Sequence, residues 1–154
     1  PELADLARAF PDTTIVLNHV GGPLAGTAAY AARREEADAQ WRAGMVELAR
    51  CLNVFVKLGG LGMPYLGFGF DQLEKPASSQ QLAQAWAPHL EHWLQTFGPS
   101  RCMFESNFPP DRATADFHVL WNAFKRFAAR YSADEKLALF HDTAVGVYRL
   151  NGVA

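Results

Sequence analysis

The sequence has few cysteines, and their placement excludes two kinds of site. Only Cys51 and Cys102 occur among its 154 residues. Two cysteines are too few for a disulfide framework and lie too far apart for a cysteine-based zinc site. Both are surrounded by apolar residues, so we expect buried, reduced thiols. Reduced thiols in turn indicate a cytoplasmic location.

The chain also lacks a strong net charge and a long apolar run. Its net charge of -2 gives no electrostatic attraction to nucleic acid or to an anionic membrane. No apolar run approaches the roughly 20 residues that span a bilayer, and the amino terminus has no secretory-signal pattern. With 49% hydrophobic and 19% charged residues, residues 1–154 are expected to form one globular domain.

Helix-like and strand-like segments alternate along the chain, which is typical of parallel βαβ units. The glycine- and proline-rich stretch 59–78 separates two of them and is expected to be a lid or a binding loop. The predicted strands are 14–19, 53–60 and 101–107. The predicted helices are 2–10, 28–51, 79–97 with a break near Pro88, 114–131, and a last one that starts at the capping box of Ser132 and Glu135 and runs to about Leu150.

Apolar residues at helical spacing predict which helix faces pack in the core. The core face of the 28–51 helix is expected to hold Trp41, Met45, Leu48 and Leu52. By contrast, His89 and His92 lie in an amphipathic segment, and we expect them on a solvated helix face rather than in a metal site. The apolar stripe of the 114–131 helix is interpreted as core packing rather than a cofactor site; it consists of Phe117, Leu120, Trp121, Phe124, Phe127 and Tyr131.

Three strands with intervening helices amount to about half of a (β/α)₈ barrel, which takes roughly 250 residues. The predicted fold class is therefore α/β, with about three parallel strands of a TIM barrel and flanking helices. An uncovered parallel sheet edge favours aggregation. We therefore expect this chain to be completed by the missing barrel half or by contact with another copy.

The ends of the predicted strands carry the candidate reactive residues, because α/β proteins gather such residues at the carboxyl ends of strands. His19 ends the first strand, Lys57 lies near the end of the second, and Asn107 ends the third. The opposite face of the 53–60 strand is aliphatic and suits packing against helices. Strand alternation therefore places His19, Lys57 and Glu105 together inside the barrel. Lys57 and Glu105 are expected either to form a structural ion pair or to meet the substrate.

Several motifs follow one another in the order found in the amidohydrolase-2 family. They are IVLNHVGGP at 15–23, NVFVKLGGL at 53–61, FGPSRCMFESNFPPD at 97–111 and DEKLALFHDTAVGVYRL at 134–150. The chain resembles the carboxy-terminal portion of this family of metal-dependent hydrolases with a TIM-barrel fold. The family includes lactonases and some decarboxylases, so the resemblance implies that the full-length protein is a hydrolase.

The resemblance assigns roles to the strand-end residues. His19 matches a histidine that serves as a metal ligand or polarises the substrate. Asn107 stands where the family's Gly-Ser-Asp-x-Pro motif has the aspartate base, and Glu105 stands where it has glycine. Asparagine cannot accept a proton at neutral pH and is a poor metal ligand. Glu105 is therefore expected to act as the base, Asn107 to orient substrate or water, and Asp111 to be a second candidate base. A divalent metal, zinc or manganese, is expected to be bound weakly at His19 or to be absent.

The implied reaction is hydrolysis of a lactone or another ester-type C–O bond in a small carboxylated or sugar-like substrate. Glu105 or Asp111 would activate a water molecule, and His19 would polarise the carbonyl group. The alternatives are decarboxylation or amide hydrolysis on the same barrel, or an inactive barrel fragment that serves as an interaction or structural domain. The expected substrate-binding residues are Lys57, which would hold a carboxylate, Asn18 and Phe108.

Overall fold

Three parallel strands form one sheet in the computed structural model, which describes residues 2–24, 26–150 and 152. The strands are β1 (Ile15–Leu17), β2 (Val54–Leu58) and β3 (Cys102–Phe104), and they lie side by side in chain order. Ile15 pairs with Val54, and Val56 pairs with Cys102. Since all strands run in the same direction, their carboxyl ends meet at one edge of the sheet.

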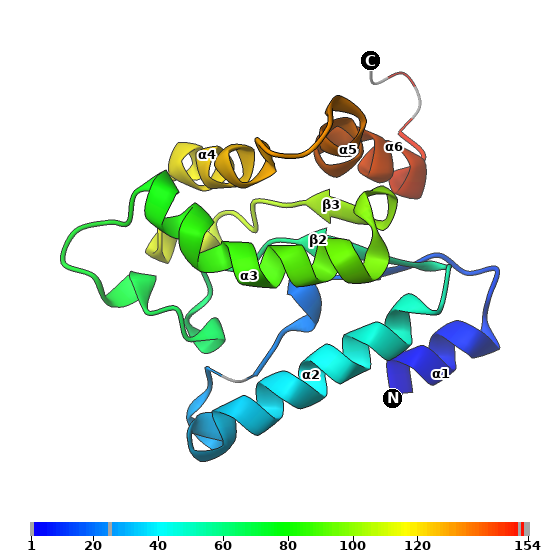
Figure 1. Ribbon diagram of the computed structural model, residues 1–154, viewed down its shortest axis with the longest axis horizontal. Coiled ribbons are helices and arrows are strands. Elements are labelled where there is room, and N and C mark those ends of the chain that lie inside the picture. Colours follow the sequence, from blue (N-terminus) through cyan, green and yellow to red (C-terminus); the bar gives the residue numbers. More distant parts are fainter. Residues whose placement is uncertain (1, 25, 151, 153–154) are drawn as a thin grey trace.

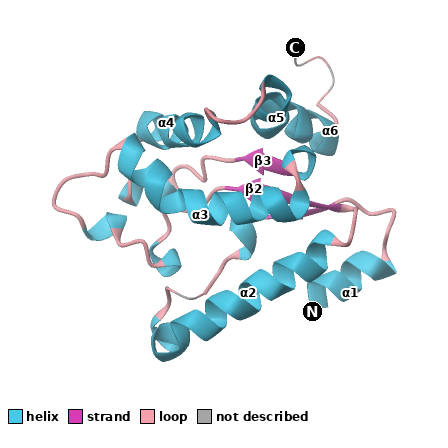
Figure 2. Cartoon of the chain, in the orientation of Figure 1, coloured by secondary structure: helices cyan, strands magenta, loops and turns pink. Residues whose placement is uncertain are grey.

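Helices connect the strands and cover one face of the sheet. Figure 1 shows α3 crossing in front of the strands, with α1 and α2 on one side and α4 to α6 along the other. In Figure 2 the strands, drawn in magenta, lie behind α3. A 3₁₀ turn (Ala28–Arg33) precedes α2, and a π-helical turn (Ala138–Asp142) joins α5 to α6. The helices are α1 (Glu2–Ala9), α2 (Arg34–Ala49), α3 (Ser79–Phe97), α4 (Phe117–Ala128), α5 (Ala133–Leu137) and α6 (Thr143–Tyr148).

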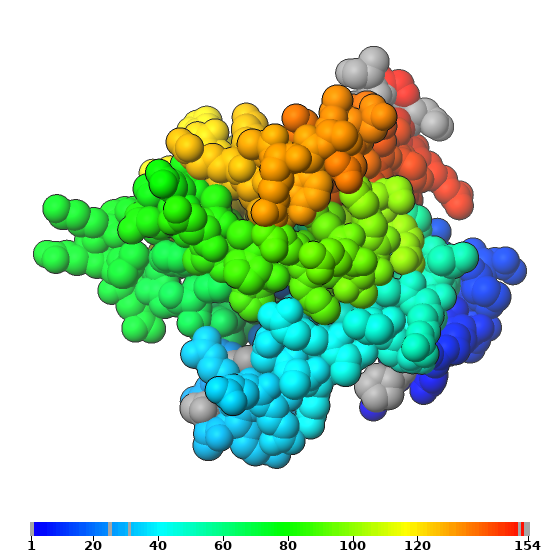
Figure 3. All heavy atoms as spheres, in the orientation of Figure 1, coloured from blue at the N-terminus to red at the C-terminus, as the bar shows by residue number. Residues whose placement is uncertain are grey.

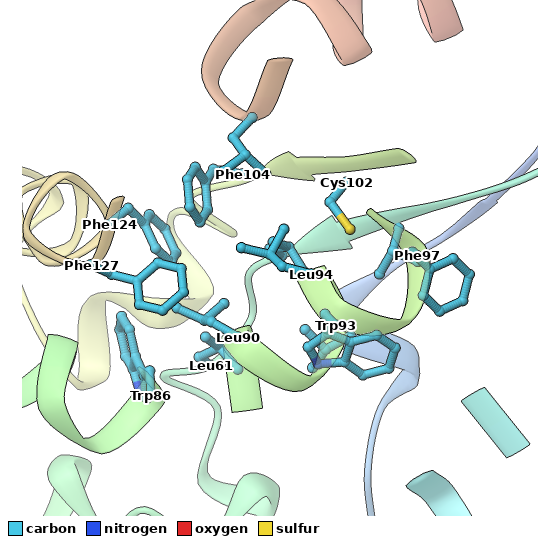
Figure 4. Packing of buried hydrophobic residues seen from close by; sticks show 14 of the residues in the cluster. Leu61, Trp86, Leu90, Trp93, Leu94, Phe97, Cys102, Phe104, Phe124 and Phe127 are labelled. Carbon is cyan, nitrogen blue, oxygen red and sulfur yellow. The ribbon is translucent and has the colours of Figure 1, made fainter. Parts of the chain in front are cut away.

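The hydrophobic core lies between β2 and the helices in front of it. Val54, Val56 and Leu58 alternate along β2 and are fully buried, as predicted for its aliphatic face. Opposite them, α3 contributes Trp86, whose ring centroid lies 5.7 Å from that of Phe124 in α4. Figure 4 shows these aromatic rings meeting between the two helices and β3. Burial of such large side chains is the main source of stability for the fold.

The helix over residues 79–97 is continuous, so the predicted break near Pro88 is wrong. A proline removes one backbone hydrogen bond from a helix and crowds the preceding turn. Here a capping box formed by Ser78 and Gln81 fixes the start of α3. Trp86 and Leu90, on either side of the exposed Pro88, are fully buried and anchor both halves of the helix. Tertiary packing therefore outweighs the local effect of the proline.

Two apolar residues predicted to face the core are exposed. Leu52 is 79% exposed because α2 ends at Ala49 and Leu52 lies in the turn beyond it. Phe117 is 43% exposed in the first turn of α4. The remaining residues of both predicted faces are buried or half-buried, which confirms the predicted orientation of the two helices.

The prediction of a solvated face for His89 and His92 is also wrong, because both rings are half-buried against α2. Their centroids lie 6.5 and 6.1 Å from the ring of Trp41. Burial lowers the pKa of each imidazole, and the positive charge of Arg42 lowers it further. Both histidines are therefore neutral packing groups between two helices.

The two cysteines are buried free thiols, as predicted. Cys102 is fully buried on β3, and burial raises its pKa to about 12. The thiolate is the reactive form of cysteine, so Cys102 is unreactive at neutral pH. None of the described helices is long and apolar enough to cross a membrane.

Candidate active site

His19 lies in a tight left-handed turn just after β1. The strand ends at Leu17, two residues earlier than predicted. His19 and Val20 both have a φ of 50°, and Gly21 continues the turn with a φ of 75°. This conformation costs an ordinary L residue roughly 1–2 kcal/mol. The indole of Trp41 donates a hydrogen bond to the Val20 carbonyl at 3.2 Å and helps to hold the turn. Backbone strain of this kind is concentrated at functional sites.

Glu105 joins His19 to Lys57 through its two carboxylate oxygens. One oxygen lies 2.6 Å from His19 Nδ1 and also accepts a hydrogen bond from the His19 backbone N–H at 3.2 Å. The other oxygen lies 3.6 Å from Lys57 Nζ. The predicted meeting of these three side chains on one side of the sheet is confirmed. A carboxylate at Nδ1 favours the tautomer that carries its proton there, so Nε2 is left as the proton acceptor.

Lys57 remains charged in this group. Burial lowers the pKa of its ammonium, but Tyr148 and the carboxylate of Glu105 outweigh that effect and raise it above its ordinary value. The ammonium lies 5.6 Å from the centre of the Tyr148 ring, which belongs to the last turn of α6. Tyr148 was not foreseen as a neighbour, because no local pattern links a helix end to a strand about ninety residues earlier.

Two glycines after β2 allow the chain to pass close to the site. A Cβ atom at Gly59 would lie 2.1 Å from Cγ of Glu105, and one at Gly60 would lie 2.9 Å from Cβ of His19. Gly60 also has a φ of 67°, which favours glycine. The glycine-rich stretch is a loop, as predicted. Its first two residues lie so close to Glu105 and His19 that there is no room for a side chain on them.

Asp111 forms a second, more buried group with Asn107. The Asn107 amide donates to one Asp111 oxygen at 2.7 Å, and the Gly62 N–H donates to the other at 3.2 Å. Asp111 is only 1% exposed. Burial raises the pKa of its carboxyl group, although the two hydrogen bonds lower it in part. This arrangement ties the segment after β3 to the loop after β2.

Asn18 and Phe108 make no hydrogen bond with His19, Glu105 or Lys57, and one tyrosine near the site was missed. Asn18 is exposed, and Phe108 packs edge-on against Phe117 with centroids 5.4 Å apart. Tyr65 belongs to the 59–78 loop and lies near enough to Asp111 and Glu105 for the charges of their carboxylates to act on its phenol. Burial raises the pKa of its phenol first, and the two carboxylates raise it further. The loop therefore brings a neutral phenol to the site.

The described residues of this chain do not complete a metal site. Nε2 of His19 is one available nitrogen donor, but Nδ1 is engaged by Glu105, and the Asn107 amide donates to Asp111. Within residues 2–24, 26–150 and 152, no three histidine, cysteine, aspartate or glutamate side chains are placed to share an ion. A catalytic zinc ion needs about three protein ligands. At least part of a full ligand set would therefore have to come from outside the described residues.

The sequence matches known proteins over nearly its whole length. The profile of the Amidohydrolase family matches residues 1–150. An uncharacterized protein of Sinorhizobium fredii, y4mH, is 35% identical over 97% of this chain and 43% of its own length. L-fucono-1,5-lactonase of Burkholderia multivorans is 32% identical over 88% of this chain and 43% of its own length. The chain therefore spans less than half of each of these relatives.

Solved structures match the arrangement of strands and helices. The crystal structure of an amidohydrolase from Burkholderia multivorans with bound HEPES superposes with a TM-score of 0.78 and 29% identity, over 97% of this chain and 49% of that chain. A crystal structure of an amidohydrolase from the same organism with bound zinc gives 0.77 and 28%, over 97% and 48%. These comparisons confirm the predicted fold class, with three strands and flanking helices of a TIM barrel.

Proposed function

The chain belongs to the amidohydrolase family, and on that premise we propose that the full natural protein hydrolyses a lactone or another ester-type C–O bond. The substrate would be a small carboxylated or sugar-like molecule. The observation that carries this proposal is the contact of His19, Glu105 and Lys57 beside the carboxyl ends of the parallel strands. TIM-barrel enzymes place their reactive groups at this end. The 32% identity to a lactonase supports the lactone as substrate class.

The contacts favour a division of roles between His19 and Glu105. Both oxygens of Glu105 are engaged, one by His19 and one by Lys57, whereas Nε2 of His19 makes no hydrogen bond to any described residue. We therefore assign proton transfer to His19, with Glu105 fixing its tautomer, instead of assigning it to Glu105 itself. Lys57 would hold a substrate carboxylate as well as the carboxylate of Glu105.

The proposed step is balanced without any further reactant. His19 Nε2 takes a proton from water while the water oxygen attacks the carbonyl carbon. The C–O bond of the lactone then breaks, and its oxygen leaves with the proton that His19 returns. The product is a hydroxy acid. The positive charge of Lys57 lies 3.6 Å from Glu105. The phenol of Tyr65 also lies near enough to Glu105 for the two groups to interact electrostatically.

Substituting Glu105 tests this assignment. In the full natural chain, Glu105→Gln should lower kcat for hydrolysis of a six-membered sugar lactone by about 10²–10³-fold, because the imidazole loses its carboxylate partner. The matched control is Glu74→Gln, which alters an exposed glutamate in the loop and should leave kcat unchanged. The release of acid from the lactone measures kcat. An unchanged kcat in Glu105→Gln would rule out the assignment, and release of CO₂ without lactone turnover would favour the decarboxylase alternative.

We also propose that zinc or manganese binds weakly, with His19 as the ligand that this chain contributes. The Asn107 amide, which is a poor metal ligand and donates to Asp111, supports weak binding, and the zinc-bound structure of a Burkholderia multivorans amidohydrolase supports zinc as one of the two metals. Metal analysis of the full natural chain after dialysis should find well below one ion per chain. Stoichiometric metal that resists dialysis would overturn the proposal.

The free edges of the sheet support a further proposal about assembly. The strand order leaves one edge of β1 and one edge of β3 without a neighbouring strand among the described residues. We propose that strands from the rest of a full barrel, or from another copy, pair there. Sedimentation of the 154-residue chain should therefore show self-association. A stable monomer at high concentration would contradict pairing with another copy, and the same monomer in the full natural chain would support pairing within one barrel.

A further inference from the structure

A cavity of about 350 Å³ lies beside the turn that holds His19, and neither His19 nor Glu105 lines it. Its walls come from the segment after β1, from α2 and α3, and from the 59–78 loop. In Figure 3 the start of α2 and this loop lie next to each other on the same side of the molecule. Val20 and Leu61 form part of the wall, and they directly follow His19 and Gly60 in the sequence. The cavity therefore touches the segments that carry the proposed active site.

Aromatic rings make the inner part of the cavity flat and apolar. Trp41 and His89 face it with ring centroids 6.5 Å apart, and Phe68 meets His89 edge-on at 5.3 Å. Leu61 and Leu66 also line the cavity and are almost fully buried. The imidazole of His89 adds no charge, because burial and Arg42 lower its pKa. Small-molecule sites are typically lined in this way, and aromatic ligands pack well against such rings.

Two arginines from α2 line the rim of this cavity. Arg34 donates one hydrogen bond, to the Gly67 carbonyl at 3.1 Å, and Arg42 donates one, from Nε to Asp38 at 2.7 Å. A guanidinium has five N–H donors, so most donors of both side chains have no partner in the described part of the chain. The charge of Asp38 is offset by Arg42. Glu35 also lines the cavity, and it is exposed, as is Arg34, so solvent screens both charges. The free N–H donors of the two arginines, rather than a net positive charge, therefore favour an anionic ligand.

We propose that this cavity binds a small aromatic carboxylate. The ring would lie between Trp41 and Phe68, and the carboxylate would accept hydrogen bonds from the guanidinium groups of Arg34 and Arg42. Paired N–H donors of arginine match the two oxygens of a carboxylate. The proposal does not depend on the hydrolase reaction, since neither His19 nor Glu105 would touch the ligand.

Titration with phenylacetate, observed by NMR, tests the proposal. Binding should shift the indole N–H signal of Trp41, which donates to Val20 in the wall of the cavity. Arg34→Met should weaken binding about tenfold or more. The matched control is Arg33→Met, which changes the preceding arginine, a residue that does not line this cavity. Lys57→Met should leave the affinity unchanged, and this separates the cavity from the proposed active site. The absence of a saturable shift, or equal affinity in Arg34→Met and the wild type, would overturn the proposal.

A second variant guards against a loop change in Arg34→Met, since Arg34 also contacts Gly67. Phe68→Ala keeps both arginines and removes one wall of the aromatic slot. It should weaken phenylacetate and have no effect on acetate. Phenethylamine, which has the same ring with a positive charge, should bind more weakly than phenylacetate to the wild type. Tighter binding of phenethylamine would contradict the role of the arginines.

Discussion

The two faces of β2 carry opposite chemistry within five residues. On the outer face Val54, Val56 and Leu58 are fully buried under α3. On the inner face the Lys57 side chain is 25% exposed and pairs with Glu105. Because side chains alternate along a strand, one register serves both purposes. The outer face supplies burial and hence stability, while the inner face supplies charges that can meet a substrate. Substitutions on the two faces should therefore be separable by what they change.

The largest loss of stability is expected for substitutions in the core that covers the outer face of β2. Trp86→Ala removes a fully buried indole in α3, and such losses cost about 3–5 kcal/mol in the free energy of unfolding. Urea unfolding followed by circular dichroism measures this change. Leu73→Ala, at a residue that is 49% exposed, is the control and should change the free energy by less than about 0.5 kcal/mol. Similar losses in both variants would show that α3 does not carry the core.

Asp111 is an exception to this division between a stabilising face and a charged face. It carries a charge near the inner site and is nevertheless only 1% exposed. Asp111→Ala should cost about 1–3 kcal/mol, because it leaves the Gly62 N–H and the Asn107 amide without their acceptor. Asp111→Asn should cost less, since the Asn107 amide can rotate to keep both hydrogen bonds. Unfolding free energies of the two variants give the comparison. Equal losses would mean that the negative charge, rather than the hydrogen bonds, is what the fold needs.

The same pair also gives a pH test. The raised pKa of folded Asp111 means that the folded state holds this proton more tightly than the unfolded state. The resulting stabilisation is fully present below the ordinary pKa of aspartate and is lost as the pH rises through the folded value. The wild type should therefore lose stability relative to Asp111→Asn as the pH rises above the ordinary pKa of aspartate. Parallel curves for the two proteins would contradict the raised pKa.

Sequence patterns predict the two faces of β2 well, and the turn at His19 less well. Period-two alternation was sufficient to place Lys57 opposite the aliphatic residues. It also brought His19 to Glu105, although the actual path is a left-handed turn and not a longer strand. No propensity predicts a β-branched residue such as Val20 with a positive φ. That conformation depends on a hydrogen bond from Trp41, whose position follows only from the packing of α2.

Long-range packing also explains the two histidines that were placed wrongly. The helical period locates His89 and His92 on one side of α3, but it does not reveal that α2 lies across from them. The ring of Trp41, about fifty residues earlier in the chain, packs against both histidines and turns a solvated face into a half-buried one. The charged inner site was easier to predict, since its residues lie at strand ends that a parallel sheet brings together.

The smallest expected effect is a change in how stability depends on pH, and it concerns His89 and His92. Burial keeps these imidazoles neutral, whereas pairing with Glu105 keeps Lys57 charged. The folded pKa of His89 and His92 is lowered, so the unfolded chain takes up their protons first as the pH falls. Their contribution to stability is present above the ordinary histidine pKa and is lost as the pH falls toward the folded values. Between about pH 7 and pH 5 the wild type should lose more stability than a His89→Gln/His92→Gln variant, by less than about 1 kcal/mol. Unfolding by urea at each pH measures the two slopes. The control is His118→Gln, at an exposed position of α4, which should keep the wild-type slope of unfolding free energy against pH. An equally steep slope in the double variant would show that burial between α2 and α3 does not hold these imidazoles neutral.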